Sequence, residues 1–282
     1  MAEINRRASL SGKLEGDSDY AQGECDRYNT AKGYLEGDDC PECLNKGRIA
    51  RKTYEPLYGE YIMTLFPCRC MAGRISKQRL LASGAGPMLQ RCTFDTYEAR
   101  TDWQRNVKSS AEAYVGLVRD GLWYYIGGDV GAGKSHICAA IMQELIKQGF
   151  SVRWMDWAEE ATRIRMSWRT EYEKSMEPWK TAQVLVVDDF LKAVKTERSK
   201  RPEREDVKLA YSIINHRYKN PALITILSSE FELADIEQFD EALSSRIEQR
   251  CTGDFVISVA SGLAEISRNQ RPIYGARGDA YE

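Results

Sequence analysis

The residues that most clearly carry chemistry form a glycine-rich loop. Its sequence, GDVGAGKS over residues 128–135, matches the pattern GxxxxGK[ST], in which backbone N–H groups enclose phosphates and a helix N-terminus adds a favourable dipole. In this pattern Lys134 reaches the β- and γ-phosphates, and the Ser135 hydroxyl helps to hold Mg²⁺. A glycine turn that only joins a strand to a helix is the weaker alternative. The loop predicts a nucleoside triphosphate bound by Gly128, Asp129, Val130, Gly131, Ala132, Gly133, Lys134, Ser135 and His136.

Two adjacent carboxylates form the second candidate group. The apolar run Val184–Val187 ends in Asp188 and Asp189, as expected of a central strand with a metal-binding acid at its tip. We expect Asp188 to coordinate Mg²⁺ and Asp189 to orient or activate the attacking water. Two solvated acids at a strand end are the alternative.

Further polar residues follow two later segments. Ser228 and Ser229 end the apolar run that starts at Leu223, which makes them candidates for sensing the γ-phosphate. A simple polar strand end is the alternative. Arg246 is the preferred arginine finger for a neighbouring subunit's site, with Arg250 second. An ordinary surface ion pair is the alternative for either arginine.

A cysteine cluster precedes the loop. Cys40 and Cys43 form one close pair, and Cys68 and Cys70 form another. Two short pairs separated by a spacer suit tetrahedral Zn²⁺, and a site closed by four thiolates is structural. Four uncoordinated thiols are the alternative. Cys25 and Cys92 are possible spare ligands, whereas Cys138 and Cys251 are more typical of small core residues.

Two segments are rich in cations. Residues 163–180 interleave Arg and Lys with Trp and Tyr, which suits single-stranded nucleic acid, but five glutamates lie in or next to this stretch, so a solvated amphipathic helix is an equal alternative. Residues 192–204 are basic and poor in aliphatic side chains. They predict an exposed loop that orders on meeting DNA or a partner.

The pattern of apolar runs predicts the elements that position these groups. Short β-rich runs at residues 122–126, 152–155, 184–187, 223–227 and 255–259 alternate with helical patterns, which indicates a parallel sheet covered by helices, an α/β fold. A helix is predicted from Lys134 to Gln148. We expect a flexible tail or a weak helix over residues 1–38, a zinc-binding domain over 39–82 and an ATPase domain over 88–282, with a hinge at residues 83–87.

Composition restricts the class of protein. The chain has 282 residues, 40 Lys and Arg against 42 Asp and Glu, and only two histidines. The balanced charge excludes a strong net positive field that would attract nucleic acid to the whole molecule. Two histidines leave few candidates for histidine-based acid–base catalysis. With neither a long apolar run nor a signal-peptide pattern at its start, the sequence predicts a cytosolic protein without membrane contact.

Together these motifs resemble the DnaC/DnaI-type replicative helicase loaders of the AAA+ superfamily, especially those of phages and mobile elements. The resemblance spans residues 40–282 and rests on CPEC with CRC, GGDVGAGKSH, VLVVDD, NHRYKNPALITILSSEFEL and EALSSRIEQR. It implies a P-loop AAA+ core with a small N-terminal zinc-binding domain that docks on a hexameric replicative DNA helicase. It also implies ATP, Mg²⁺ and Zn²⁺ as cofactors, single-stranded DNA as a partner, self-association through the ATPase domain, slow, switch-like ATP hydrolysis, and the bacterial cytoplasm as the location.

The chain departs from the resemblance at the sensor strand. Many relatives end it with Ser-Asn, whereas Glu230 follows Ser229 here. Arg268 or Arg271 would have to act as a second sensor arginine. Three alternatives stay open: an IstB-like transposition-helper ATPase, against which the cysteine cluster argues; a replication initiator, for which the chain after Val259 looks too short; and a non-hydrolysing, nucleotide-bound adaptor.

Overall fold

The computed structural model divides into two units, residues Met1–Arg74 and Ile75–Glu282. It describes residues 18–82, 86, 91–118, 121–167, 171–192, 194–196, 199–252 and 254–259. Most of the expected hinge and both candidate second-sensor arginines lie outside these residues. Within the described part of the chain, no helix has the length and apolarity needed to cross a membrane.

The first unit is built on an antiparallel hairpin. Strand β1 (Arg48–Glu55) pairs with β2 (Glu60–Pro67) over their whole lengths. A helix over residues 18–30 buries Ala21 and Cys25, one turn apart, and its Asn29 side chain both donates to and accepts from the Ala50 backbone at 2.9 Å. The segment expected to be a flexible tail or a weak helix therefore contains a helix, and this helix is bonded to the edge of β1.

Helix α2 (Cys70–Ala82) runs across the division between the units. Within the second unit, its buried Ser76 Oγ accepts from the backbone N–H of Val152 at 2.8 Å. This contact caps the start of an edge strand of the sheet described next.

The second unit contains a five-stranded parallel sheet in the order β4-β5-β8-β3-β9. Its strands are β3 (Tyr124–Gly128), β4 (Val152–Asp156), β5 (Val184–Phe190), β8 (Ile224–Ser229) and β9 (Val256–Val259). The central strands are apolar on both faces because helices cover both faces. All five strands predicted from the sequence are confirmed, with no end shifted by more than three residues.

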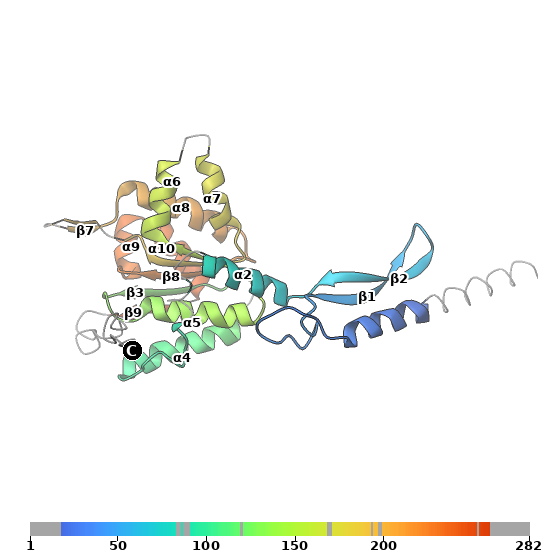
Figure 1. Cartoon of the computed structure of the whole chain (residues 1–282). Coiled ribbons are helices and arrows are strands. Elements are labelled where there is room, and N and C mark those ends of the chain that lie inside the picture. The colour runs from blue at the N-terminus through green and yellow to red at the C-terminus, as the bar shows by residue number, and fades with distance from the viewer. Residues whose placement is uncertain are drawn as a thin grey trace, which may run out of the picture. The chain divides into compact units, whose positions relative to one another are not determined.

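Helices pack on the two faces of this sheet (Figure 1). Helices α4 (Asp102–Leu117) and α5 (Lys134–Lys147) contact each other on one face. On the other face lie α6 (Trp157–Met166), α7 (Tyr172–Thr181), α8 (Arg204–Tyr218), α9 (Leu233–Phe239) and α10 (Glu241–Cys251). The strand order explains this division, because right-handed crossovers that travel in opposite directions along a sheet place their helices on opposite faces.

Helix α5 confirms the prediction for residues 134–148 to within one residue. Ile137, Ile141 and Leu145 recur every four residues and are fully buried, so one stripe of the helix faces the core. Gly149 follows at φ +89°, a left-handed conformation that glycine adopts at helix ends without steric cost.

A small antiparallel hairpin interrupts the path from β5 to α8. Its strands are β6 (Val194–Thr196) and β7 (Ser199–Arg201). The segment predicted to be an exposed basic loop thus contains paired backbone, and the hairpin projects away from the central sheet (Figure 1).

Arg217 on α8 joins a helix to two strand ends. The side chain is fully buried, and its guanidinium donates to the carbonyls of Ala182 at 2.7 Å and Trp179 at 3.0 Å and to Thr225 Oγ1 at 3.0 Å. Burial lowers the pKa of Arg217 to about 9, so the group is charged at neutral pH. Several oxygen acceptors, rather than one carboxylate, compensate its desolvation.

Candidate functional site

The glycine-rich loop lies between the carboxyl end of β3 and the first turn of α5. Gly133 precedes the helix at φ +84°, where a side chain would be strained. At Gly128, with φ +119°, an added Cβ would lie 2.1 Å from the carbonyl oxygen of Val259. This loop path therefore requires glycine at both positions.

Lys134 is directed back into the loop. Its Nζ donates to the carbonyl oxygens of Asp129 at 2.7 Å and Gly128 at 3.0 Å, and the residue is almost completely buried. These contacts place a cation inside the curve of the loop, where a bound anion would be held.

Asp188 at the tip of β5 lies near the same loop. Burial raises the pKa of Asp188, while hydrogen bonds from the Ser228 and Ser135 side chains oppose the increase. The Ser228 hydroxyl donates to Asp188 Oδ1 at 2.5 Å. The structure thus brings together Ser135 and Asp188, the two groups predicted to hold Mg²⁺, a cation that prefers hard oxygen ligands.

Asp189 occupies a different environment. The β5–β8 register shifts between Val187 and Phe190, and the Asp189 N–H donates to Ser228 Oγ at 3.0 Å. Its Oδ2 lies 2.5 Å from Nζ of Lys192, and this hydrogen bond raises the pKa of Lys192. In the sequence, Lys192 is marked only as one residue of the basic segment 192–204.

The two serines at the end of β8 are both fully buried and differ in role. Ser228 bridges Asp188 and the backbone of Asp189. The Ser229 hydroxyl donates to the Phe190 carbonyl at 2.8 Å and accepts from the Phe231 N–H at 3.1 Å. In this conformation Ser229 connects backbone segments, and its sensor role stays a prediction.

His136 connects the segment that contains Thr93 and Tyr97 to the start of α5. Its Nε2 lies 2.8 Å from the carbonyl oxygen of Thr93, and its ring packs edge-on against Tyr97. Burial lowers the pKa of His136, which favours the neutral ring, and since a carbonyl only accepts, Nε2 carries the proton. A contact between residues so far apart in the chain gives no local sequence signal.

Arg246 and Arg250 on α10 both make contacts within the chain. Arg246 donates to Asn215 Oδ1 at 3.0 Å and packs over the Tyr211 ring at 4.9 Å. Arg250 donates to the carbonyls of Gly121, Leu223 and Pro221 at 2.9–3.2 Å. Arg250 therefore joins loops in this structure, and the finger role of Arg246 stays a prediction.

The four predicted zinc ligands lie together in the first unit. The Sγ atoms of Cys40, Cys43, Cys68 and Cys70 all fall within 4.8 Å of one another, and the Cys40–Cys68 and Cys43–Cys70 distances are 3.7 and 3.6 Å. Zinc–sulfur bonds of about 2.3 Å in a tetrahedron place sulfur atoms about 3.8 Å apart, so the spacing fits Zn²⁺. Cys25 and Cys92 are not members of this cluster.

Local geometry prepares the cysteine cluster for a cation. Although burial opposes it, the Gly47 N–H and the neighbouring thiols lower the pKa of Cys43 to about 7. Gly47 has φ +73°, so the turn after the first pair directs this N–H at sulfur. Burial raises the pKa of Cys68 and Cys70, because desolvation disfavours the charged thiolate unless a cation lies beside it.

The aromatic and basic segment at α6 and α7 is largely neutralised. Arg163 pairs with Glu159 and Glu160, while Lys180 pairs with Glu173. Tyr172 and Trp179 pack against the core, and residues 168–170 lie outside the described part. These contacts favour the amphipathic-helix alternative over a surface for nucleic acid.

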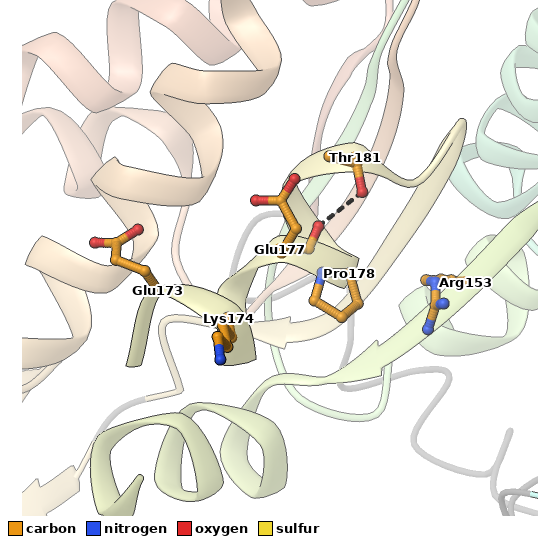
Figure 2. Close-up of a pocket in the computed structure, with 6 residues that line it drawn as sticks. All are labelled: Arg153, Glu173, Lys174, Glu177, Pro178 and Thr181. Atoms are coloured by element: carbon orange, nitrogen blue, oxygen red, sulfur yellow. Dashed lines mark hydrogen bonds between the residues drawn. The ribbon is translucent and has the colours of Figure 1, made fainter. Parts of the chain in front are cut away.

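A shallow groove lies between β4 and α7, lined by Arg153, Glu173, Lys174, Glu177, Pro178 and Thr181 (Figure 2). Arg153 is near the start of β4, and Thr181 shortly precedes β5. The groove is therefore at the amino ends of the parallel strands, at the opposite edge of the sheet from the phosphate loop. None of the residues predicted to bind nucleotide, Mg²⁺ or Zn²⁺ lines it.

The geometry defines the class of protein: a P-loop ATPase core of the AAA+ type, in which β8 separates the phosphate-loop strand from the acidic strand. The chain belongs to the family of IstB-like ATP binding proteins, whose pattern matches residues 88–258. This match confirms nucleotide binding and ATPase chemistry as the general property of the second unit.

Two relatives in sequence support the resemblance to DnaC-type proteins. The chain is 27% identical over 240 residues to the phage-like element PBSX protein XkdC of Bacillus subtilis, covering 81% of this chain and 85% of XkdC. It is 30% identical over 112 residues to the replicative helicase loader DnaC of Escherichia coli, covering 38% of this chain and 46% of DnaC. A crystal structure of DnaI aligns with 61% of this chain and 89% of its own, at 22% identity and a TM-score of 0.46.

Proposed function

We propose that this protein is an ATP-dependent loader that binds a hexameric replicative DNA helicase and delivers it onto single-stranded DNA. The observation that carries the proposal is the presence, in one chain, of a four-cysteine module and an ATPase core similar in sequence to DnaC and XkdC. In this proposal the cysteine module docks on the helicase, and the nucleotide state of the core controls how tightly the protein binds the helicase and single-stranded DNA. The protein acts in the bacterial cytoplasm and is encoded by a phage or mobile element.

The site residues have defined roles in this function. Lys134 and the loop N–H groups hold the phosphates of ATP, and Ser135 and Asp188 hold Mg²⁺, which supplies charge stabilisation at the γ-phosphate. Asp189 orients the attacking water. Arg246 acts from a neighbouring subunit, which requires self-association of the ATPase unit and release of the Asn215 contact.

The first experiment measures the mass of the complex with the replicative helicase of the host bacterium by light scattering after size exclusion. We expect a defined assembly whose stability differs between ATP and no nucleotide. Lys134→Ala should lose nucleotide binding and this ATP dependence while keeping its fold, because it removes the cation inside the loop.

Two cysteine variants provide a matched pair. Cys68→Ser removes a predicted zinc ligand and should abolish the complex. Cys92→Ser, outside the cluster, should leave the complex intact. If wild-type protein forms no complex in any nucleotide state, the loader proposal fails.

A transposition-helper ATPase is the second candidate, favoured by the IstB-like family match over residues 88–258. It predicts an ATP-dependent complex with a transposase and none with the helicase. The same size-exclusion measurement with transposase from a neighbouring gene separates the two functions. Failure of the protein to hydrolyse ATP with any partner would favour a non-hydrolysing adaptor.

A further inference from the structure

Asn45 follows the first cysteine pair and bonds back to it. Its φ is +64°, a left-handed conformation that asparagine adopts more readily than most residues. Its Oδ1 accepts from the backbone N–H of Cys40 at 2.9 Å, and its Nδ2 donates to the Asp39 carboxylate at 2.7 Å. Since one end of the side chain must accept and the other must donate, an amide fits this position and a carboxylate does not.

Arg74 joins this amide to the second cysteine pair. It lies four residues after Cys70 on α2, so the two side chains share one face of the helix. Burial raises the pKa of Cys70, and a hydrogen bond from Arg74 opposes that increase. The Arg74 guanidinium also donates to Asn45 Oδ1 at 3.0 Å. A chain of contacts therefore links the second pair, through Arg74 and Asn45, to the backbone of Cys40 in the first pair.

Arg74 also holds the loop that leads into Cys40. Its Nη2 donates to the carbonyl oxygen of Asp38 at 2.6 Å, and its Nη1 donates to the carbonyl oxygen of Glu36. A guanidinium presents its N–H donors in a planar fork, whereas a lysine ammonium is a compact point charge. Several separate acceptors therefore indicate that the shape of the fork matters in addition to its charge.

Two further cations near the cluster are directed elsewhere. The side chain of Arg69 is 73% exposed and pairs with Glu42 at 2.9 Å. The Lys46 Nζ donates to the carbonyl oxygen of Asn29 at 3.3 Å. Arg74, in contrast, contacts a ligand thiol and the loop of the opposite pair, so it lies where it offsets the excess negative charge of four thiolates around one Zn²⁺.

We propose that Asn45 and Arg74 form the outer shell of the zinc site. Arg74 extends from the helix that begins at Cys70 and fixes the side chain of Asn45. Asn45 in turn fixes the backbone of Cys40, so that this thiolate is held where the metal binds. Both are positioning residues, because neither supplies a metal ligand. This inference rests on the zinc site assigned to the four cysteines and is independent of the partner that the module binds.

The first test measures the zinc affinity of the full-length protein by competition with a chromophoric chelator. Asn45→Gly removes the side chain but keeps the left-handed backbone accessible, and it should lower zinc affinity about tenfold. Leu44→Gly is the matched control. Leu44 also has a positive φ, +48°, but its side chain cannot hydrogen-bond, so zinc affinity should stay close to that of wild type.

Variants of Arg74 separate the shape of the side chain from its charge. Arg74→Gln should lower zinc affinity by a similar factor, and Arg74→Lys should restore little of it, because one ammonium cannot reach the acceptors that the fork spans. Arg51→Gln removes an equal charge from β1 and should leave zinc affinity unchanged. Full recovery in Arg74→Lys would overturn the positioning role in favour of charge alone.

A double variant tests whether the two residues act together. In Asn45→Gly with Arg74→Gln, the loss of zinc affinity should be smaller than the product of the two single losses, since both residues act through one chain of contacts. Independent losses that multiply would refute the connection between them.

A spectroscopic readout separates positioning from a general loss of stability. At saturating Co²⁺, a variant that is only less stable has the absorption spectrum of wild type. Asn45→Gly should instead show weaker thiolate-to-cobalt charge-transfer absorption, because Cys40 leaves the metal in part of the molecules. Alkylation of the metal-loaded variant, followed by peptide mass spectrometry, should modify Cys40 more than Cys43.

The outcomes distinguish this inference from the proposed function. Wild-type zinc affinity in Asn45→Gly and Arg74→Gln would refute the outer shell, and so would a lower affinity with an unchanged cobalt spectrum in Asn45→Gly. If wild-type protein binds no zinc, the metal site and its outer shell both fail. A normal helicase complex with unchanged metal properties in the variants refutes only this inference, whereas the expected metal properties without any helicase complex refute only the loader.

Discussion

Ser228 connects both acids of the β5 tip, and its hydroxyl therefore sets the chemistry of Asp188. It donates to Oδ1 of Asp188 while accepting from the backbone N–H of Asp189. No other described side chain is bonded to both residues in this structure.

Replacing Ser228 by alanine should shift the pH dependence of ATP hydrolysis. The bond from Ser228 lowers the Asp188 pKa against the effect of burial, so its loss raises the pKa further. Since Mg²⁺ needs the ionised carboxylate, the acidic limb of the kcat profile should move to higher pH. Ser229→Ala is the matched control, because that hydroxyl bonds to the Phe190 backbone; equal shifts in both variants would contradict the assignment.

Arg217 should be a determinant of stability without a role in nucleotide binding. Arg217→Lys keeps the charge but cannot reproduce the fork that reaches Ala182, Trp179 and Thr225. Leaving buried acceptors unsatisfied should lower the free energy of unfolding by about 3 kcal/mol, measured by denaturant titration. An exposed control, Arg105→Lys, should change it little, and an unaltered midpoint for Arg217→Lys would contradict the assignment.

Helix α10 carries two arginines, one turn apart, with different surroundings. Arg250 holds the carbonyls of the loops before β3 and β8, whereas Arg246 packs on Tyr211 and Tyr218 of α8. Helix α10 thus both holds the loops that precede β3 and β8 and carries a candidate subunit contact.

The two arginines should separate stability from catalysis. Arg250→Met should lower the melting temperature more than Arg246→Met, because it leaves several loop carbonyls without a donor. Arg246→Met should instead reduce ATP hydrolysis in the assembled protein while retaining nucleotide affinity. Mixing Arg246→Met with Lys134→Ala subunits provides the control. A Lys134→Ala subunit still carries Arg246 and can supply it to the intact nucleotide site of an Arg246→Met neighbour, so a finger acting between subunits should restore ATP hydrolysis at those mixed interfaces only.

At the scale of the whole molecule, the two units should respond independently to metal removal. Purified protein should contain about one zinc per chain, as four thiolates require, measured by elemental analysis. A zinc-selective chelator, added with Mg²⁺ kept in excess, should increase hydrogen exchange in β1 and β2, because little apolar core holds that small unit together. Nucleotide affinity of the second unit should not change, and its loss on chelation would show that the units do not fold separately.

The chemical groups and the order of the elements follow from the sequence alone. The loop at residues 128–135, the acids after Val187 and the cysteine pairs are short-range patterns whose spacing reflects local geometry, and alternating apolar runs located all five strands and helix α5. These features are visible because each depends on neighbours within a few residues along the chain.

Which of those groups come into contact, and which already have partners, depends on how the helices and strands pack. Ser228 lies 40 residues from Asp188, and His136 is 43 residues from Thr93, so neither contact follows from local spacing. The arginines and lysines of α6 and α7 were predicted equally well as DNA contacts or as a solvated face, because their carboxylate partners become neighbours only when helices form and pack. The ion pair between Lys192 and Asp189 likewise depends on the backbone turn at the end of β5. Composition and periodicity do not predict that turn.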